Sequence, residues 1–316
     1  MGGFNLRAPT PKLLMPANTP PAFPPTKILL ATDLSARGDR ALDRAAQLAR
    51  QWKAELVIVH AIDGRHTHLS DAAYPLPSWH RASDSSAAIQ DRIRRDLREE
   101  VDQLKIHIEQ GEPPQVILNT ASREGCDLII VGLSQNGLIG QMLLGRTVEH
   151  LVRKSPVSVL VVKSRPNGTY QHVLVGTDFT EESRYGLEAA AASFPDCRFT
   201  VMHAFEMRYK AFLSDTSLSR DFATMEKEAI EKFVGDSQLT PETRSRTRTL
   251  IEHGSPDLML CRYVEDQQAD LTVIGAYGRG FLFHLLVGGY TPRIVDSVPS
   301  DVLLIRAHRA EPPPHP

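Results

Sequence analysis

The residues of this chain best suited to binding chemistry are glycines near its C-terminus. They follow the apolar run "DLTVIG" and flank the helix-like stretch "FLFHLLV". The glycine-rich run consists of Gly275, Gly278, Arg279, Gly280, Gly288 and Gly289. Glycines let a backbone approach a ligand closely, and their amides can hold phosphate groups. The spacing matches neither a P-loop nor a dinucleotide fingerprint, and plain tight turns are the alternative interpretation.

Two Thr-Asp pairs are the second feature whose residues could bind a ligand. "KILLATDLS" begins at Lys27 and "HVLVGTDFT" begins at His172, so Asp33 and Asp178 each follow an apolar run. A carboxylate at a strand end could hold a ribose or help to bind a metal. It could instead cap the helix that follows, in competition with Ser35 or Thr180.

These features recur because the chain repeats itself in order. Asp33 and Asp178 are 145 positions apart, and from Gly111 against Gly254 onward the offset is 143. The matched pairs of segments are "ELVIVHAID" and "FTVMHAFE", "IEQGEPPQVI" and "IEHGSPDLML", "CDLIIVG" and "ADLTVIG", and "SPVSVLVVK" and "VPSDVLLIR". Such a series predicts two copies of one structural unit.

Each copy alternates short apolar runs with amphipathic helical stretches. In the first half we expect strands near 27–32, 54–62, 105–109, 127–132 and 157–163. We expect helices over "ALDRAAQLARQW" and over "QDRIRRDLREEVDQL", where Ile93, Leu97, Val101 and Leu104 share one face. This alternation predicts an α/β fold of two tandem doubly wound domains, each a five-stranded parallel sheet. Ligands of such sheets bind at the carboxyl ends of the strands, where strand order reverses.

Composition sets the broad class. A chain of 316 residues with 41% hydrophobic residues can form two domains, and a net charge of −2 gives no general reason to bind nucleic acid or a membrane. Cys126, Cys197 and Cys261 are widely spaced, which favours a cytoplasmic protein without disulfides or structural zinc. We expect a Pro-rich tail over 1–26, a first domain over 27–165 and a second over 170–308.

The repeated strand-end "ATD" and "GTD", the "VxHA" second strands and a final Gly-2x-Gly-9x-Gly loop closely resemble the universal stress protein family. The resemblance covers nearly everything from Lys27 to Arg306. It implies a Rossmann-like fold and an ATP- or AMP-type ligand, with a divalent ion such as Mg²⁺ or Mn²⁺ on its phosphates. It also implies that the two halves pair as a pseudo-dimer and that whole chains can dimerise further.

The resemblance assigns site residues unequally to the two halves. In the second half, the positions that match the family's site are Gly176, Thr177, Asp178, Ala204, Gly275, Gly278, Arg279, Gly280, Gly288 and Gly289. Gly289 stands where the family has Ser or Thr, so a backbone amide remains and the hydroxyl is lost. We therefore expect nucleotide in the second half.

The first half departs further from the family pattern. Its matching positions are Asp33, Ala61, Gly132, Gly145 and Arg146. Gln135 replaces the second glycine and Arg146 replaces the Ser or Thr. Either Arg146 binds phosphate through its guanidinium, or this half has lost its site.

Several other polar groups have structural interpretations. His60 and His203 occupy matched places in the second strands, and we expect buried, hydrogen-bonded histidines there. Arg244, Arg246 and Arg248 alternate, which predicts a strand with one basic face. The insertion at 64–86 holds His66, His68 and His80, which could bind zinc or simply be scattered in a flexible loop. Pro75, Pro77 and Trp79 in the same insertion suggest a lid or a contact surface.

The sequence contains no GxSxG elbow, no HExxH and no pairing of a nucleophile with its base. Together with this absence, the family resemblance implies a cytoplasmic regulatory module that binds adenine nucleotide and a protein partner. The alternatives are a weak ATPase that uses Asp178, and an interaction protein whose glycine loops bind nothing.

Overall fold

The structure is a computed structural model and describes residues 23–35, 38–62, 86–97, 100–133, 145–206, 216–277 and 290–307. The strands of the first half are β1 Lys27–Ala31, β2 Glu55–Ile62, β3 Leu104–Gln110, β4 Leu128–Gly132 and β5 Ser158–Val162. Its helices are α1 Gly38–Trp52, α2 Ser86–Asp96, α3 Pro113–Glu124 and α4 Arg146–Lys154. The strands lie where the apolar runs predict them.

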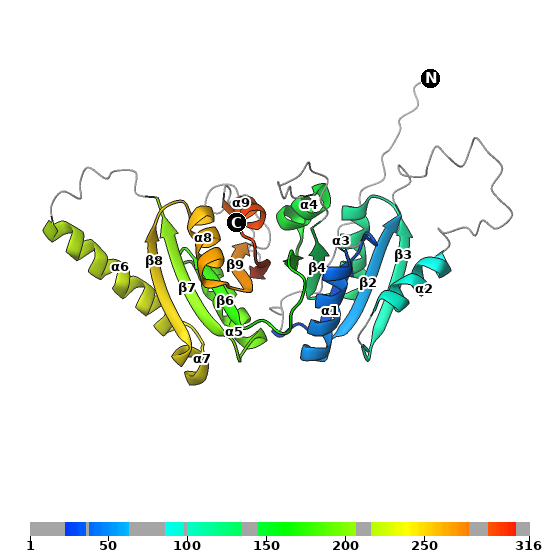
Figure 1. The fold of residues 1–316 in the computed structure, drawn as a ribbon, viewed down its shortest axis with the longest axis horizontal. Helices are drawn as coiled ribbons and strands as arrows, with labels where there is room; N and C mark the ends of the chain where they lie inside the picture. The colour runs from blue at the N-terminus through cyan, green and yellow to red at the C-terminus, as the bar shows by residue number, and fades with distance from the viewer. Residues whose placement is uncertain are drawn as a thin grey trace, which may run out of the picture.

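The second half repeats this order with one additional short helix. Its strands are β6 His172–Thr177, β7 Arg198–Phe205, β8 Thr247–His253, β9 Leu271–Tyr277 and β10 Asp301–Ala307. Its helices are α5 Glu181–Ser193, α6 Thr216–Asp236, α7 Pro241–Ser245, α8 Pro256–Gln267 and α9 Tyr290–Ser297. In Figure 1 this half lies on the left and the first half on the right.

All these strands form one ten-stranded sheet in the order β3-β2-β1-β4-β5-β10-β9-β6-β7-β8. Within each half the neighbouring strands are parallel, which confirms the doubly wound α/β prediction. Strand order reverses between β1 and β4 and again between β6 and β9. These two places are the positions at which ligands bind in such sheets.

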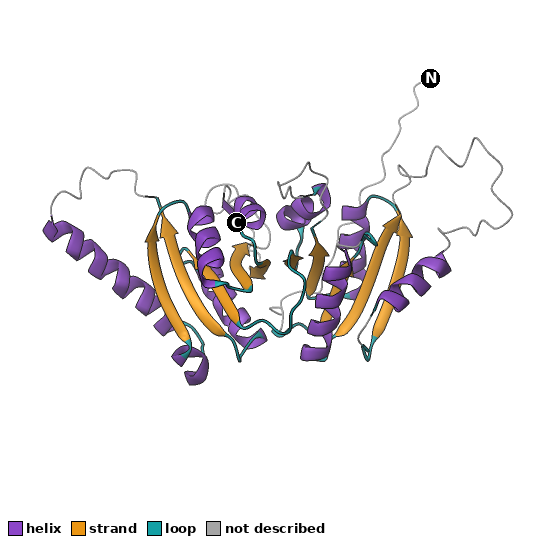
Figure 2. Cartoon of the chain, in the orientation of Figure 1, coloured by secondary structure: helices purple, strands orange, loops and turns teal. Residues whose placement is uncertain are grey.

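Helices cover both faces of the sheet (Figure 2). Buried residues of α1, α2, α5 and α6 pack on one face, and buried residues of α3, α4, α8 and α9 pack on the other. The central strands β1 and β5 are apolar after their first residue because both of their faces are covered. The core therefore runs through both halves as two layers.

Two sequence predictions fail at the edges of this sheet. The predicted helix over 90–104 is too long, since α2 ends at Asp96 and Leu104 pairs with Leu56 as the first residue of β3. The three arginines do not share one strand face. Arg244 lies in α7 and donates to two carbonyl oxygens, Arg246 follows that helix, and Arg248 alone lies in β8.

The halves join through β5 and β10, which run antiparallel with Leu160 opposite Leu303. The predicted pairing of the two halves is therefore present within one chain. At matched ends of these strands, Lys163 Nζ donates to Val298 O and Arg306 Nη2 donates to Val152 O. Each buried cation thus bonds a helix end of the opposite half.

Asp301 completes the junction on one side only. This fully buried carboxylate accepts hydrogen bonds from the backbone amides of Lys163 and Ser164 at 2.8 and 3.0 Å, and from Tyr170 Oη at 2.7 Å. The buried Arg44 side chain lies 3.5 Å away and stacks over the Tyr170 ring. Ser158 stands at the matched position on the other side and accepts from the Arg306 amide.

Lys163 should make stability depend on pH. Burial lowers its pKa to about 8, despite nearby Asp296, Asp301 and Cys261. Between this value and the ordinary pKa of 10.5, the unfolded chain binds more protons, so the contribution of Lys163 to the free energy of unfolding rises with pH. We expect the free energy of unfolding of wild type, relative to that of Lys163→Met, to rise by up to about 3 kcal/mol from pH 7 to pH 10.

Urea unfolding of both proteins across this range measures that difference. Burial raises the pKa of Cys126 and Cys197 to about 12, which lowers the stability of both proteins above pH 9. The comparison with the variant cancels this effect. A difference in free energy of unfolding that stays constant with pH would contradict the lowered pKa of Lys163.

Candidate functional site

The Thr-Asp pair of the second half forms a tight turn at the end of β6. Thr177 Oγ1 accepts a hydrogen bond from the Phe179 amide at 3.0 Å, and Phe179 adopts a left-handed conformation with φ of 65°. The first half repeats this turn, with Leu34 at φ 59° and its amide 3.0 Å from Thr32 Oγ1. A large side chain in this region costs about 1–3 kcal/mol, and such strain concentrates at functional sites.

The turn also decides the role of the aspartate. Asp178 Oδ1 accepts from the Thr180 amide at 3.2 Å and from Thr180 Oγ1 at 2.6 Å. Thr180 itself is the N-cap of α5 and accepts from the Ser183 amide. The interpretation of Asp178 as the helix cap is therefore wrong. Asp178 orients the capping residue and presents an exposed carboxylate at the sheet edge.

Asp33 has the same role in the first half. Its Oδ1 accepts from the amide and the hydroxyl of Ser35 at 3.0 and 2.6 Å. Ser35 Oγ in turn accepts from the amide of Gly38, the first residue of α1. Ser35, rather than Asp33, therefore caps the helix.

The matched histidines hold the same turns in place. His60 Nδ1 lies 2.9 Å from Thr32 O, and His203 Nδ1 lies 2.8 Å from Thr177 O. A protonated Nδ1 donates to these carbonyl oxygens, so each second strand is tied to the end of its neighbour. The structural interpretation is confirmed, although both side chains are half-buried rather than fully buried.

Gly275 lets helix α5 lie directly against β9. A Cβ atom at this position would lie 2.2 Å from Glu182 O and 2.7 Å from Ser183 Cα. Gly186, one turn further along α5, faces the backbone of Gly275 less tightly, with a built Cβ 3.2 Å from Gly275 Cα. Gly275 is therefore needed for contact between α5 and β9. The sequence pattern assigned it only to a ligand-binding loop and did not predict this contact.

The second half has a cavity at its strand-order reversal, between the carboxyl ends of β6 and β9. It has a volume of about 120 Å³ and lies between these strands, β7 and the adjacent helices α8 and α9. Its described lining residues are Gly176, Thr177, Asp178, Ser183, Met202, Ala204, Pro256, Leu260, Ile274, Gly275, Tyr290, Thr291 and Ile294. Five residues named from the sequence therefore meet around one space. Gly278, Arg279, Gly280, Gly288 and Gly289 lie outside the described residues.

Sequence reasoning missed the helical walls of this cavity. Leu260 of α8 and Ile294 of α9 belong to ordinary apolar patterns, which also describe core residues. Gly176 keeps the space open, since a Cβ there would lie 2.8 Å from Ile274 Cδ1. The matched position in the first half is Ala31.

The first-half candidates occupy equivalent elements. Ala61 lies in β2, Gly132 ends β4, and Gly145 is the N-cap of α4 without a side-chain cap. Arg146 is the exposed first residue of that helix. Its role as a phosphate ligand stays a prediction, and Gln135 and the histidines of 64–86 lie outside the described residues.

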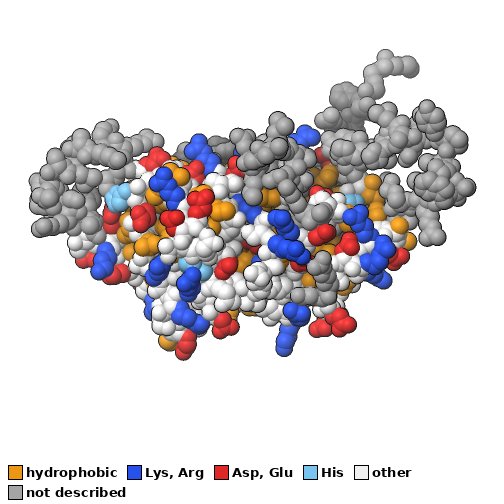
Figure 3. Space-filling model, in the orientation of Figure 1, with side chains coloured by type: hydrophobic (Ala, Val, Ile, Leu, Met, Phe, Trp, Pro, Cys, Tyr) orange, Lys and Arg blue, Asp and Glu red, His pale blue; other side chains and the backbone are white. Residues whose placement is uncertain are grey.

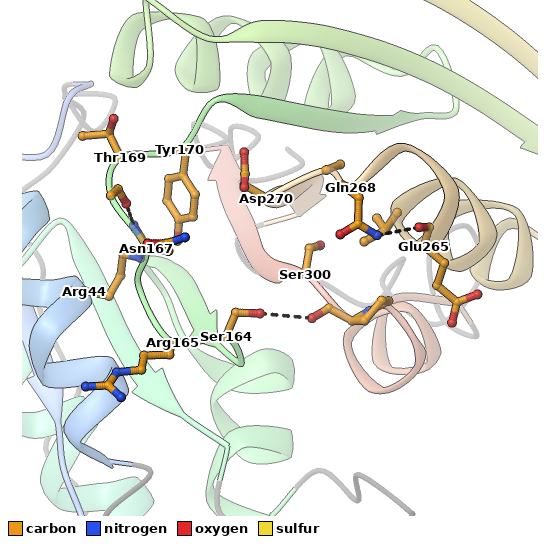
Figure 4. Close-up of a pocket in the computed structure, with 14 residues that line it drawn as sticks. Arg44, Ser164, Arg165, Asn167, Thr169, Tyr170, Glu265, Gln268, Asp270 and Ser300 are labelled. Carbon is orange, nitrogen blue, oxygen red and sulfur yellow. Dashed lines mark hydrogen bonds between the residues drawn. The ribbon is translucent and has the colours of Figure 1, made fainter.

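A larger cavity of about 460 Å³ lies elsewhere, under the segment that connects the two halves (Figure 4). Its walls come from that connection, from the end of α8 and from the residues before β9 and β10. Arg44 and Tyr170 already bind Asp301 there, and Asp270 accepts from the amides of Gln171 and His172. These polar groups hold the junction, so this space is not our candidate site.

Among the described residues, charge and thiol chemistry indicate no second site. Basic and acidic side chains are interspersed on the face shown in Figure 3. Within the described ranges, no three His, Cys, Asp or Glu side chains gather in a way that could hold a metal ion. Burial raises the pKa of the Cys126 and Cys197 thiols to about 12, which disfavours reactive thiolates. None of the described helices is both long and apolar enough to cross a membrane.

Fold and site together define a tandem α/β protein with a ligand-type cavity at a strand-order reversal. The chain matches the universal stress protein family over residues 25–163 and again over 169–306, and it belongs to that family. A universal stress protein of Mycolicibacterium smegmatis is 23% identical over 298 residues, which is 88% of this chain and 96% of that protein. Universal stress protein MJ0577 of Methanocaldococcus jannaschii is 27% identical over 154 residues, or 44% of this chain and 95% of that one.

Solved structures share the fold along most of the chain. A functionally unknown protein, PA1789 of Pseudomonas aeruginosa, has a TM-score of 0.66 at 22% identity, covering 90% of this chain and 93% of its own. A universal stress protein of Archaeoglobus fulgidus has a TM-score of 0.58 at 18% identity, covering 89% and 96%. At these identities the likeness shows the fold and nothing more.

The contact at Gly275 should make that glycine indispensable to the second half. We expect Gly275→Ala to lower the free energy of unfolding by about 3 kcal/mol or more, because its Cβ meets backbone atoms that cannot rotate away. Gly235→Ala in α6 is the matched control, since its Cβ would meet nothing within 4 Å. It should gain about 0.5–1 kcal/mol from helix propensity. Equal stabilities of the two variants in urea unfolding would contradict this assignment.

Proposed function

We propose that the second half binds an adenine nucleotide and that the chain is a regulatory module rather than a dedicated enzyme. The observation that carries this proposal is the cavity at the carboxyl ends of β6 and β9. Gly176, Thr177, Asp178 and Ala204 meet there, although they come from different strands and turns. Asp178 and Ala204 are the positions beside which the family resemblance places the ribose and the adenine.

The chemistry of the walls favours an uncharged ring. Met202, Ala204, Leu260, Ile274 and Ile294 make much of the surface apolar. Among the described lining residues the charged side chain is Asp178, an anion, so a phosphate in this space would lose water without gaining a cation. The volume of about 120 Å³ is also below the roughly 300–1,000 Å³ of pockets that enclose whole drug-sized ligands. A nucleotide would therefore place its base here and its ribose toward Asp178.

The second half is the better candidate because of single-residue differences. Gly176 leaves space that the matched Ala31 would reduce, since any Cβ at 176 approaches Ile274. The sequence of the first half also replaces two positions of the family loop, with Gln135 and Arg146. Phosphate binding, with or without a divalent ion, is assigned in this proposal to the glycine-rich run 278–289.

Helix α9 offers a physical route from this site to the junction between the halves. Thr291 and Ile294 line the cavity, and Val298, one residue past the helix, accepts a hydrogen bond from Lys163 of the first half. A ligand that shifts α9 would move the carbonyl that Lys163 binds. In this proposal, nucleotide occupancy changes the packing of the halves and so a surface that a protein partner recognises.

A large side chain in the cavity of the second half should weaken ATP binding, whereas the same change in the first half should not. Ala204→Phe places a ring among the walls described above, and we expect it to weaken ATP binding by about 100-fold or more. Ala61→Phe is the matched control at the equivalent position of the first half. We expect that variant to bind ATP within about threefold of wild type. Isothermal titration calorimetry with ATP and magnesium measures both affinities.

Two results would contradict the assignment. Loss of binding in Ala61→Phe with retention in Ala204→Phe would move the site to the first half. Absence of binding in wild type would favour the nucleotide-free interaction protein. Circular dichroism of each variant confirms that the fold is kept.

A further inference from the structure

One threonine that lines the cavity carries a buried hydroxyl with no hydrogen-bond partner among the described residues. Thr291 lies in the first turn of α9, lines the cavity and is only 1% exposed. In the ligand-free chain its Oγ1 atom is buried and meets no donor or acceptor among the described residues. Buried hydroxyls in native structures nearly always have a partner, and leaving one without costs stability.

The other small hydroxyls of the cavity are satisfied internally. Thr177 Oγ1 accepts from the Phe179 amide and lies 2.9 Å from Ser183 Oγ. Ser183 Oγ also donates to Thr180 O at 2.9 Å. These groups hold the turn after β6, so they are committed before any ligand arrives. Thr291 differs from them because its hydrogen-bonding capacity is unused.

The repeat supplies a natural comparison for this position. Val148 is the residue of α4 that matches Thr291, and it is buried with no polar atom to satisfy. Valine has nearly the same shape as threonine, so packing alone does not require a hydroxyl at this place in the fold. The hydroxyl is therefore a feature of the half that has the cavity described above.

We propose that the Thr291 hydroxyl forms a hydrogen bond with a heteroatom of the nucleotide base and so helps to select that base. This inference rests on the proposed function and assigns a recognition residue within it. The surroundings favour the base over the phosphates, because Leu260, Ile274 and Ile294 border the same space and no described lysine or arginine lines it. A hydroxyl can donate to a ring nitrogen or accept from an exocyclic amine.

The test combines ligand affinity with the stability of the ligand-free protein. In Thr291→Val, adenosine and ATP should both bind about tenfold more weakly, which corresponds to about 1.4 kcal/mol. The ligand-free variant should melt at the same temperature as wild type or about 2 °C higher, because an unsatisfied polar group has been removed. Thr291→Ser keeps the hydroxyl and should restore most of the affinity.

Thr272→Val is the matched control for removing a buried hydroxyl. Thr272 lies at the start of β9, outside the described cavity lining, and its Oγ1 lies 2.8 Å from Ser300 Oγ. This variant should lower the melting temperature and leave both affinities unchanged. In a series of adenosines that each lack one ring nitrogen or the amine, one analogue should bind wild type and Thr291→Val equally well.

Each contrary result has a distinct meaning. Unchanged affinity in Thr291→Val, or a loss seen with ATP and not with adenosine, would overturn the contact with the base. A lower melting temperature of ligand-free Thr291→Val would show that the protein already satisfies the hydroxyl, which would also overturn it. Absence of binding in wild type would overturn the proposed function itself, and the control variants separate that outcome from the others.

Discussion

The direct contact of helix α5 with the end of β9 is the constraint on which the site depends. Gly275 and Gly186 allow the two backbones to meet with no side chain between them. Thr180 caps α5 at this point, and Asp178 holds Thr180 from the left-handed turn at Phe179. The strained turn, the cap and the close contact thus fix one side of the cavity, and α8 and α9 form its other sides.

The junction between the halves is the second determinant of the architecture. Antiparallel pairing of β5 and β10 makes one sheet from two domains, with Lys163 and Arg306 crossing to opposite halves at matched positions. The symmetry is incomplete, because Asp301 gathers Tyr170 and Arg44 on the side where the chain passes between halves. The two halves therefore present equivalent surfaces that differ in single residues at the junction and at the cavity.

The sequence predicted the strands, the repeat and the strand ends that converge, because continuous apolar runs and matched motifs report these directly. It did not predict the roles of single residues that depend on distant neighbours. Gly275 resembles a loop glycine until α5 is placed against it, and Thr291 resembles an ordinary helix residue until its hydroxyl is found without a partner. The helix boundary at Asp96 was also missed, because Leu97, Val101 and Leu104 pack on the core without continuing the helix.

The central claim is that an adenine base occupies the cavity between β6 and β9. The most direct test is a methyl NMR titration of the isoleucine-labelled protein with ATP and magnesium. The account predicts saturable shifts of the Ile274 and Ile294 signals, which line the cavity. Ile117 lies in α3 at the first-half position that matches Leu260, and its signal should stay in place. Shifts of Ile117 alone, or no shift of any isoleucine at millimolar ATP, would contradict it.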